Sequence, residues 1–213
     1  MSLELEKQFT RVFRQYKTAH PAIREAECLK VLYPSLLPPI EQEDYFAGRT
    51  LLMEWKGVGF SPDVTLYSLP HGMGYFYREK VFQEALDAAE PGSLEACELQ
   101  DMMRFWEKEN TTAKVKEHFT PEIRSFFPSD SFAGEVGVCF PLYRMTGAYE
   151  NYGLLVQEGL PGLKRLVEER RRMAREEQKD FYKGLLMVLQ LVEDCCASYA
   201  EMAREQMKTA SPQ

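Results

Sequence analysis

The sequence predicts a mainly helical fold with a few short strands. Apolar residues recur at every third or fourth position over long stretches, which is the spacing of one helix face. Between these stretches lie segments rich in glycine, proline and aromatic residues, which favour turns and short strands. The 213-residue chain is 45% hydrophobic and 12% aromatic, so it can bury a sizeable core, and we expect residues 1–213 to form a single domain.

Two helices are predicted near the N-terminus. The first spans 3–17, and the second spans 23–33, after Pro21, which suits a first helical turn, and before Pro34, which we expect to end it. From 45 to 77, glycines, prolines and aromatic residues indicate an ordered but irregular region with short strands. The apolar face of the first helix consists of Leu5, Phe9, Val12, Phe13 and Tyr16.

Further helices are predicted in the middle of the chain. The apolar spacing indicates helices over 78–89 and over 93–110, the latter starting at Ser93. A short helix is expected at 114–118, and Thr120-Pro121-Glu122 is a helix-start signal. The apolar side of the 93–110 helix consists of Leu99, Met102, Met103 and Trp106.

The last third is the most regular part of the sequence. A short strand is expected before it, where Val136, Val138 and Phe140 alternate with small residues. A loop then leads into a helix whose first turn tolerates Pro161. A long second helix follows, and we expect its apolar stripe of about six turns to be buried against other helices. The stripe consists of Phe181, Leu185, Leu189, Val192, Cys196, Tyr199 and Ala203.

Composition and charge exclude several classes of protein. The net charge is −7, and the cluster Arg170–Arg172 is interleaved with glutamates, as on a solvated helix face, so nucleic acid is not an expected partner. The charged N-terminus lacks the apolar core of a signal peptide, and the longest apolar run, 184–189, is too short to span a bilayer. Five cysteines without a CxxC pair indicate reduced thiols, with neither a disulfide framework nor a zinc site. We therefore expect a soluble, cytoplasmic protein with no membrane partner.

The residues alone do not form a catalytic constellation. Cys139 with His71 or His118 as a base has no local support, and a cysteine in an alternating apolar run is more often a small buried hydrophobe. The glycine pairs GVGF at 57–60 and GMGY at 72–75 do not continue into a phosphate-binding motif, so we interpret them as tight turns beside aromatic residues. We predict no catalytic residue, no metal ligand and no cofactor on this chain.

Four segments carry a resemblance to a known family. The segment NYGLLVQEGLPGL, 151–163, resembles the D-Y-x-x-L-L-x-x-G-L-x-G-L segment of the glycyl radical enzymes, the pyruvate formate-lyase-like family. The segments at 43–50, EDYFAGRT, at 99–111, LQDMMRFWEKENT, and at 180–205, DFYKGLLMVLQLVEDCCASYAEMARE, are similar to three others of that family, in the same order. Departures include Asn151, where the family usually has Asp, and Cys196 and Ser198, where it often has more polar or basic residues.

The resemblance covers only the N-terminal portion of a family member. It implies a helical layer and the first strand region of the family's α/β barrel. The 213 residues contain neither a G-C-x-E loop, which carries the family's thiyl cysteine, nor an R-V-x-G-Y/W loop, which carries its glycyl radical. Two interpretations of the resemblance stay open: a truncated or split portion of a lyase or dehydratase, active only with a complementary C-terminal chain, or a stand-alone helical interaction module that binds an intact family member, another protein or a small ligand. A third sets the resemblance aside and predicts a helical binding protein with an aromatic pocket around 55–77. A homodimer is also left open.

The resemblance also implies a substrate pocket. In the family, residues just before the 151–163 segment line it, which points to Gly147 and Ala148, with Arg144, Thr146 and Tyr149 adjacent; a second alignment points to Glu135 instead. The alternative is that Gly147 is a turn glycine and Arg144 a surface charge. Since Arg144 lies in an otherwise apolar run, we expect it to be partly buried, to face the same cleft as Tyr149 and to bind an anionic partner or ligand.

Overall fold

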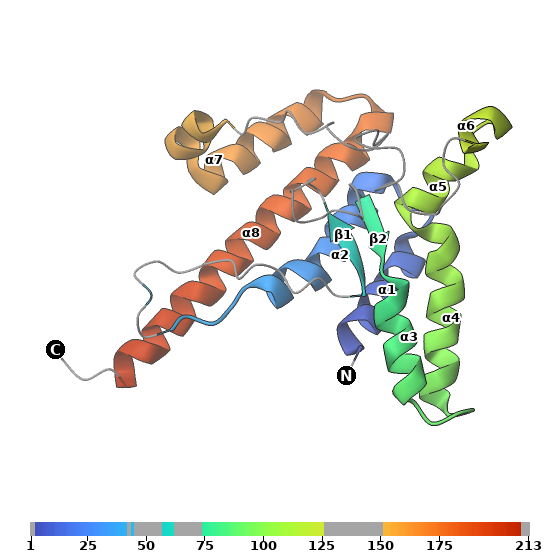
Figure 1. Ribbon diagram of the computed structural model, residues 1–213. Coiled ribbons are helices and arrows are strands. Elements are labelled where there is room, and N and C mark those ends of the chain that lie inside the picture. The colour runs from blue at the N-terminus through green and yellow to red at the C-terminus, as the bar shows by residue number, and fades with distance from the viewer. Residues whose placement is uncertain (1–2, 42–43, 45–56, 62–73, 126–150, 210–213) are drawn as a thin grey trace. The chain divides into compact units, whose positions relative to one another are not determined.

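The computed structural model describes residues 3–41, 44, 57–61, 74–125 and 151–209 and confirms a mainly helical fold with short strands (Figure 1). By contacts the chain divides into two compact units, one formed by 1–10 and 55–149 and the other by 11–54 and 150–213. The single domain over 1–213 stays a prediction. The elements are α1 (Glu4–Tyr16), α2 (Pro21–Leu36), β1 (Val58–Ser61), β2 (Gly74–Tyr77), α3 (Glu79–Ala88), α4 (Leu94–Glu109), α5 (Thr111–Glu117), α6 (Pro121–Ser125), α7 (Tyr152–Met173) and α8 (Glu176–Thr209).

The first unit is built around an antiparallel hairpin. Strands β1 and β2 pair with Val58 opposite Tyr77 and Phe60 opposite Tyr75, and α4 and α5 both contact β2. Helices α3 and α4 pack side by side (Figure 1). Helix α4 starts where predicted, because the Ser93 hydroxyl accepts a hydrogen bond from Ala96 N at 3.1 Å and so caps the helix. Fully buried side chains of this unit are Phe9, Val58, Phe82, Leu99 and Trp106.

One glycine pair of the first unit has a different role from the one predicted. The sequence GVGF is not a tight turn: Gly57 precedes β1, and Gly59 lies inside it. A Cβ on Gly57 would lie 2.7 Å from the Phe82 ring, so the glycine is needed for close packing. Gly74, in the second pair, has a φ of +102°, a conformation that favours glycine.

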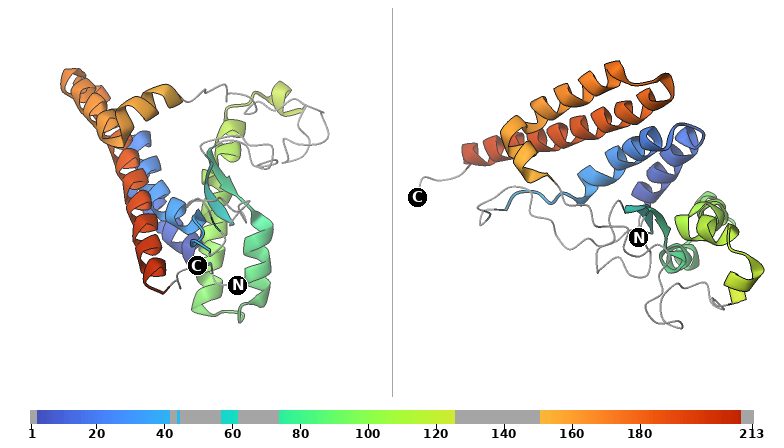
Figure 2. Two further views of the ribbon diagram at one scale, coloured as in Figure 1. Left: turned by 90° about the vertical axis from the view of Figure 1, so that its left-hand side faces the viewer. Right: turned by 90° about the horizontal axis from the view of Figure 1, so that it is seen from above.

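The second unit contains three long helices. Helix α8 packs against α2 and α7, and α7 folds back along α8 (Figure 2). The helices α2 and α8 approach closely at Gly184, where an added Cβ would lie 2.7 Å from the Ala22 backbone. Toward the C-terminal end of α8, the Tyr199 hydroxyl donates to Pro38 O at 2.9 Å. Glycine at position 184 therefore sets how near α2 and α8 lie.

Helix α2 extends beyond its predicted end. It continues through Pro34 to Leu36. Proline near the end of a helix removes a single backbone donor, and only the last turn follows it, so the loss is smaller than in a helix centre. The His20 side chain caps the other end by accepting from Ala22 N at 3.2 Å.

Helix α7 contains a break that the sequence indicated only in part. The segment predicted as a loop starts with a helical turn, which Asn151 caps by accepting from Leu154 N at 3.0 Å. Gly159 interrupts the helix with φ 60° and ψ −179°, and the longer helical run continues through Pro161. The glycine is required here because its backbone conformation is one that other residues rarely adopt.

The predicted burial of the α8 stripe is wrong for most of its length. Phe181 is 46% exposed, Leu185 and Val192 are each 36% exposed, and Cys196 is also exposed. Within the stripe, Tyr199 is buried. Gly184 and Leu191, which lie outside the stripe, are buried as well. Helix α2 thus packs on a neighbouring face, where the absence of a side chain at position 184 allows close approach.

Candidate functional site

The predicted substrate-pocket residues cannot be placed. Glu135, Arg144, Thr146, Gly147, Ala148 and Tyr149 all lie outside the described residues, as does the strand predicted at 136–140. The expected burial of Arg144 and its position beside Tyr149 therefore stay predictions.

The cysteines and histidines that are described do not form a reactive pair. Cys28 is buried, and burial together with the neighbouring Cys196 and Asp194 raises the pKa of Cys195, which keeps that thiol protonated. His20 caps α2 and His118 follows α5, while Cys139 and His71 lie outside the described ranges. Within those ranges no cluster of three or more His, Cys, Asp or Glu side chains could hold a metal ion.

The most unusual polar feature of the first unit is a buried hydrogen-bonded series that we call the α1 polar chain: Glu6, Thr10 and Trp106. The indole Nε1 of Trp106 donates to Thr10 Oγ1 at 2.8 Å, and that hydroxyl donates to Glu6 O at 2.7 Å. The Glu6 carboxylate, 2% exposed, accepts from Gly57 N at 3.0 Å. Buried polar groups are costly unless paired, so these bonds fix α1 against α4 and the start of β1.

An aromatic cluster surrounds the α1 polar chain. The ring centroids of Phe9 and Trp106 are 5.9 Å apart, and those of Phe9 and Tyr75 are 6.4 Å apart. Tyr75 also lies 4.9 Å from Phe60 across the hairpin. These separations are within the range of favourable aromatic pairs. The rings and the polar chain therefore both join α1 to the hairpin and α4.

The hairpin has a second anchor on α5. Thr111 Oγ1 accepts from Tyr75 N at 2.8 Å, and a side chain on Gly74 would collide with Thr111. On the same strand, the pKa of Tyr77 is raised, mainly by burial and to a smaller extent by the charges of Glu79 and Glu107. Among the described residues, its buried hydroxyl has no hydrogen-bond partner. A hydroxyl that holds its proton so firmly is poorly suited to act as a base.

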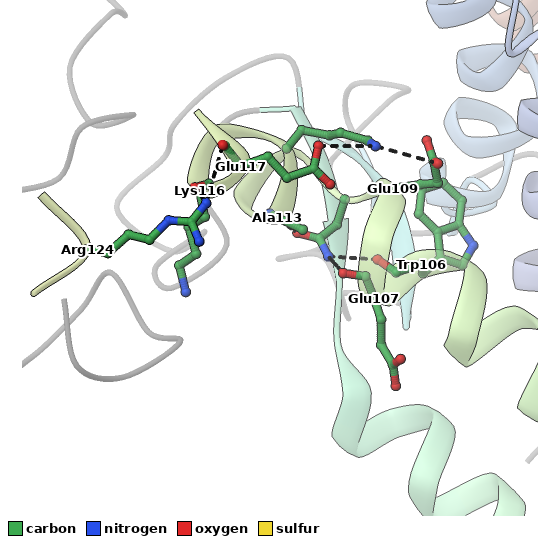
Figure 3. Close-up of polar contacts among 9 residues, drawn as sticks. Trp106, Glu107, Glu109, Ala113, Lys116, Glu117 and Arg124 are labelled. Carbon is green, nitrogen blue, oxygen red and sulfur yellow. Dashed lines mark hydrogen bonds and ion pairs between the residues drawn. The ribbon is translucent and has the colours of Figure 1, made fainter. Parts of the chain in front are cut away.

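Asn110 joins α4 to α5 through both ends of its side-chain amide. The amide nitrogen donates to Trp106 O at 2.7 Å and to Glu107 O at 3.3 Å, and the amide oxygen accepts from Ala113 N at 2.8 Å (Figure 3). The same side chain therefore satisfies carbonyls at the end of α4 and a free N–H at the start of α5.

Charged side chains also bind backbone carbonyls and each other along α5 and after its end. Lys114 lies 3.7 Å from both Glu109 and Glu117. Arg124 donates to Lys116 O at 3.2 Å (Figure 3). It also donates to Phe119 O at 3.2 Å, so it satisfies carbonyls at and beyond the end of α5. The roles of Glu6, Thr10, Asn110 and Arg124 were not predicted from the sequence. For Glu6 and Thr10 a signal was present, because they share a helix face with Phe9 and Phe13.

The described polar groups thus hold backbone in place and do not form a nucleophile and its base. A sequence model of the pyruvate formate lyase-like family matches residues 1–213, and the chain belongs to this family, which confirms the predicted resemblance to it. No curated protein and no solved structure matches the chain. None of the described helices has both the length and the hydropathy to cross a membrane.

Proposed function

We propose that these 213 residues form a scaffold portion of a glycyl radical lyase or dehydratase and do not carry its reacting groups. The observation that supports this most directly is the family match over residues 1–213, since the segment contains neither family loop. The chemistry of the family needs a glycyl radical and a thiyl cysteine, so a polypeptide without both loops cannot turn over substrate alone.

The described contacts support a scaffold role. Glu6, Thr10 and Asn110 are all engaged with backbone groups, and the aromatic cluster is packed against α1 and α4. Preorganised active sites depend on supporting shells of this kind, held rigid by packing and hydrogen bonds. The complementary chain that completes the enzyme is the partner in this proposal.

The substrate wall in this proposal is the segment before Asn151. Arg144 is the residue that would bind an anionic head group, because a guanidinium in an apolar run needs an anionic partner, and Thr146 and Tyr149 would orient the same molecule. Gly147 and Ala148 would leave room for it, and Glu135 would take this place under the second alignment.

The test uses electron paramagnetic resonance. The isolated chain, treated anaerobically with a radical-SAM activase, should give no glycyl doublet. Mixed with a C-terminal chain that carries both family loops, the same preparation should give the doublet and substrate turnover. A doublet from the 213 residues alone would contradict the proposal, and so would a C-terminal chain that reaches full turnover without them.

A second function has one specific observation in its favour. The exposed apolar residues of α8 suit an interaction module that binds a protein partner. The genomic neighbourhood separates the two functions: an adjacent reading frame with the G-C-x-E and R-V-x-G-Y loops favours the split enzyme.

A further inference from the structure

Helix α7 consists of two helical pieces joined by a bend at Gly159. The first piece, which we call the α7 arm, is 152–158, and the second is 160–173. At Gly159 the φ of 60° and ψ of −179° lie in a region that is essentially restricted to glycine. Pro161 lies in the first turn of the second piece, where its missing N–H leaves no helical bond unmade. The backbone therefore favours a bend at this point, and the two pieces run in different directions (Figure 2).

The two pieces are held in different ways. The second piece is fastened to α8, because Lys164 Nζ donates to Gln190 Oε1 at 2.6 Å and pairs with Glu193. Most side chains of the arm are exposed, and its apolar residues Tyr152 and Val156 are 65% and 83% exposed. Burial of these apolar side chains therefore does not hold the arm, and its angle depends on contacts at the bend itself.

One side chain of the arm reaches across the bend. Glu158 Oε2 accepts from Arg165 Nη2 at 2.9 Å, so an ion pair joins the end of the arm to the second piece. Because both side chains are partly exposed, the pair is weak by itself. Packing supports it: a Cβ on Gly162 would lie 2.7 Å from both Cβ and Oε2 of Glu158, so the glycine provides the space that this side chain occupies. The angle of the arm is set by these contacts together.

The arm begins directly after the segment proposed above as the substrate wall. Asn151 caps the arm by accepting from Leu154 N at 3.0 Å, and Tyr149 is two residues before it. Two residues of chain span at most about 7 Å, so the direction of the arm limits where the end of the wall can lie. A misplacement of about 1 Å can lower the rate of an enzyme by about a hundredfold.

We propose that Glu158, Gly162 and Arg165 are positioning residues, which fix the angle of the α7 arm and thereby the place of the substrate wall. This inference rests on the proposed function, since the wall belongs to it. The three residues do not touch the substrate and act only through the arm.

The first experiment measures the angle of the arm in the full chain by residual dipolar couplings of its backbone amides. In the wild type, the arm and the second piece should fit one fixed arrangement. In Gly162→Ala and in Arg165→Glu, the couplings of the arm should change or average out, while those of the second piece stay. The charge exchange E158R/R165E should restore the wild-type couplings. Gly153→Ala is the matched control, because an added Cβ there meets no atom closer than 3.5 Å.

The second experiment measures substrate turnover after mixing with the C-terminal chain that carries both family loops. G162A and R165E should lower kcat/KM by at least about tenfold, because the wall is misplaced. The glycyl doublet should keep its wild-type intensity, since its loop is not on this chain. E158R/R165E should recover kcat/KM, and G153A should not change it.

The outcomes separate this inference from the proposed function. No doublet from the wild-type mixture would contradict the proposed function. A doublet with unchanged kcat/KM in both G162A and R165E would overturn only the positioning role. That role would also be overturned by couplings that are averaged out in the wild-type arm, or by loss of the doublet in R165E, which would mean that the bend supports the fold as a whole.

Discussion

Helices α4 and α8 are both amphipathic in sequence, yet they use their apolar residues differently. In α4, Leu99, Met102, Met103 and Trp106 are all buried, as their spacing predicts. In α8, the longest regular stripe of the chain leaves Phe181, Leu185 and Val192 exposed. Periodicity therefore identifies a helix and its apolar side, whereas the side that is packed depends on how closely the neighbouring helix can approach it.

The neighbours explain the difference. The ring of Trp106 in α4 packs against Phe9, and its indole N–H donates to the Thr10 hydroxyl, so both the apolar and the polar part of the side chain have a partner. Helix α8 meets α2 at Gly184, where two backbones come closer than any side chain would allow. Close backbone approach therefore determines the packed face of α8.

The largest contrast should come from aromatic truncations on the two helices. Trp106→Ala removes a fully buried ring and the donor to Thr10, and should lower the free energy of unfolding by about 3–5 kcal/mol. Phe181→Ala, measured by the same urea titration at a concentration where the chain is monomeric, should cost under about 1 kcal/mol. Equal losses in the two variants would mean that Phe181 is core and that the comparison is wrong.

Two glycine substitutions should have opposite signs. Gly184→Ala places a Cβ 2.7 Å from the Ala22 backbone, and should cost about 1–3 kcal/mol in spite of its better helix propensity. Gly153→Ala, in the first turn of α7, meets only the Asn151 side chain at 3.5 Å and should be neutral or stabilising by up to about 1 kcal/mol. Thermal unfolding of both variants checks the pair, and a stable G184A would show that α2 can move away from α8 freely.

Substitutions at Asn110 should separate the two roles of its side chain, as a donor at the end of α4 and as an acceptor at the start of α5. Asn110→Ala removes the contacts to Trp106 O and Ala113 N and should cost about 1–2 kcal/mol. Asn110→Asp keeps an acceptor for Ala113 N but loses the donor to Trp106 O, so it should recover about half of that loss. Hydrogen exchange gives the site-specific readout: the Ala113 amide should exchange faster in N110A than in N110D.

The smallest effect concerns pH. Burial, opposed by Arg24 and His20, raises the pKa of Glu25 in α2 above its unfolded value. The folded state then binds this proton more tightly than the unfolded state, so stability falls as pH rises through the folded pKa. Glu25→Gln should be more stable than wild type at pH 7 by under about 1 kcal/mol, and the difference should vanish below about pH 4. Glu169→Gln, at an exposed position of α7, gives the baseline for the pH titration.

The sequence predicted the elements better than their packing. Ser93 marked the start of α4 because a capping hydroxyl acts locally, and the resemblance of the 151–163 segment identified the family. The predicted end of α2 was wrong, since a helix tolerates a proline such as Pro34 in its final turns. The role of Glu6 was missed because its partner, Gly57, is 51 residues away, and no local pattern encodes such a contact.

Contacts of large sequence separation also govern the order in which the chain can fold. The bonds from Tyr199 to Pro38 and from Gln206 to Ile40 span 161 and 166 residues, and Gly184 packs against Ala22. Loop closure over such spans is slow and costs entropy before any contact is gained. During synthesis, α2 emerges early and must wait for α8 before its packing face is covered, whereas most of the first unit is contiguous and can assemble sooner. Until α8 leaves the ribosome, the packing face of α2 is therefore open to aggregation and to chaperone binding.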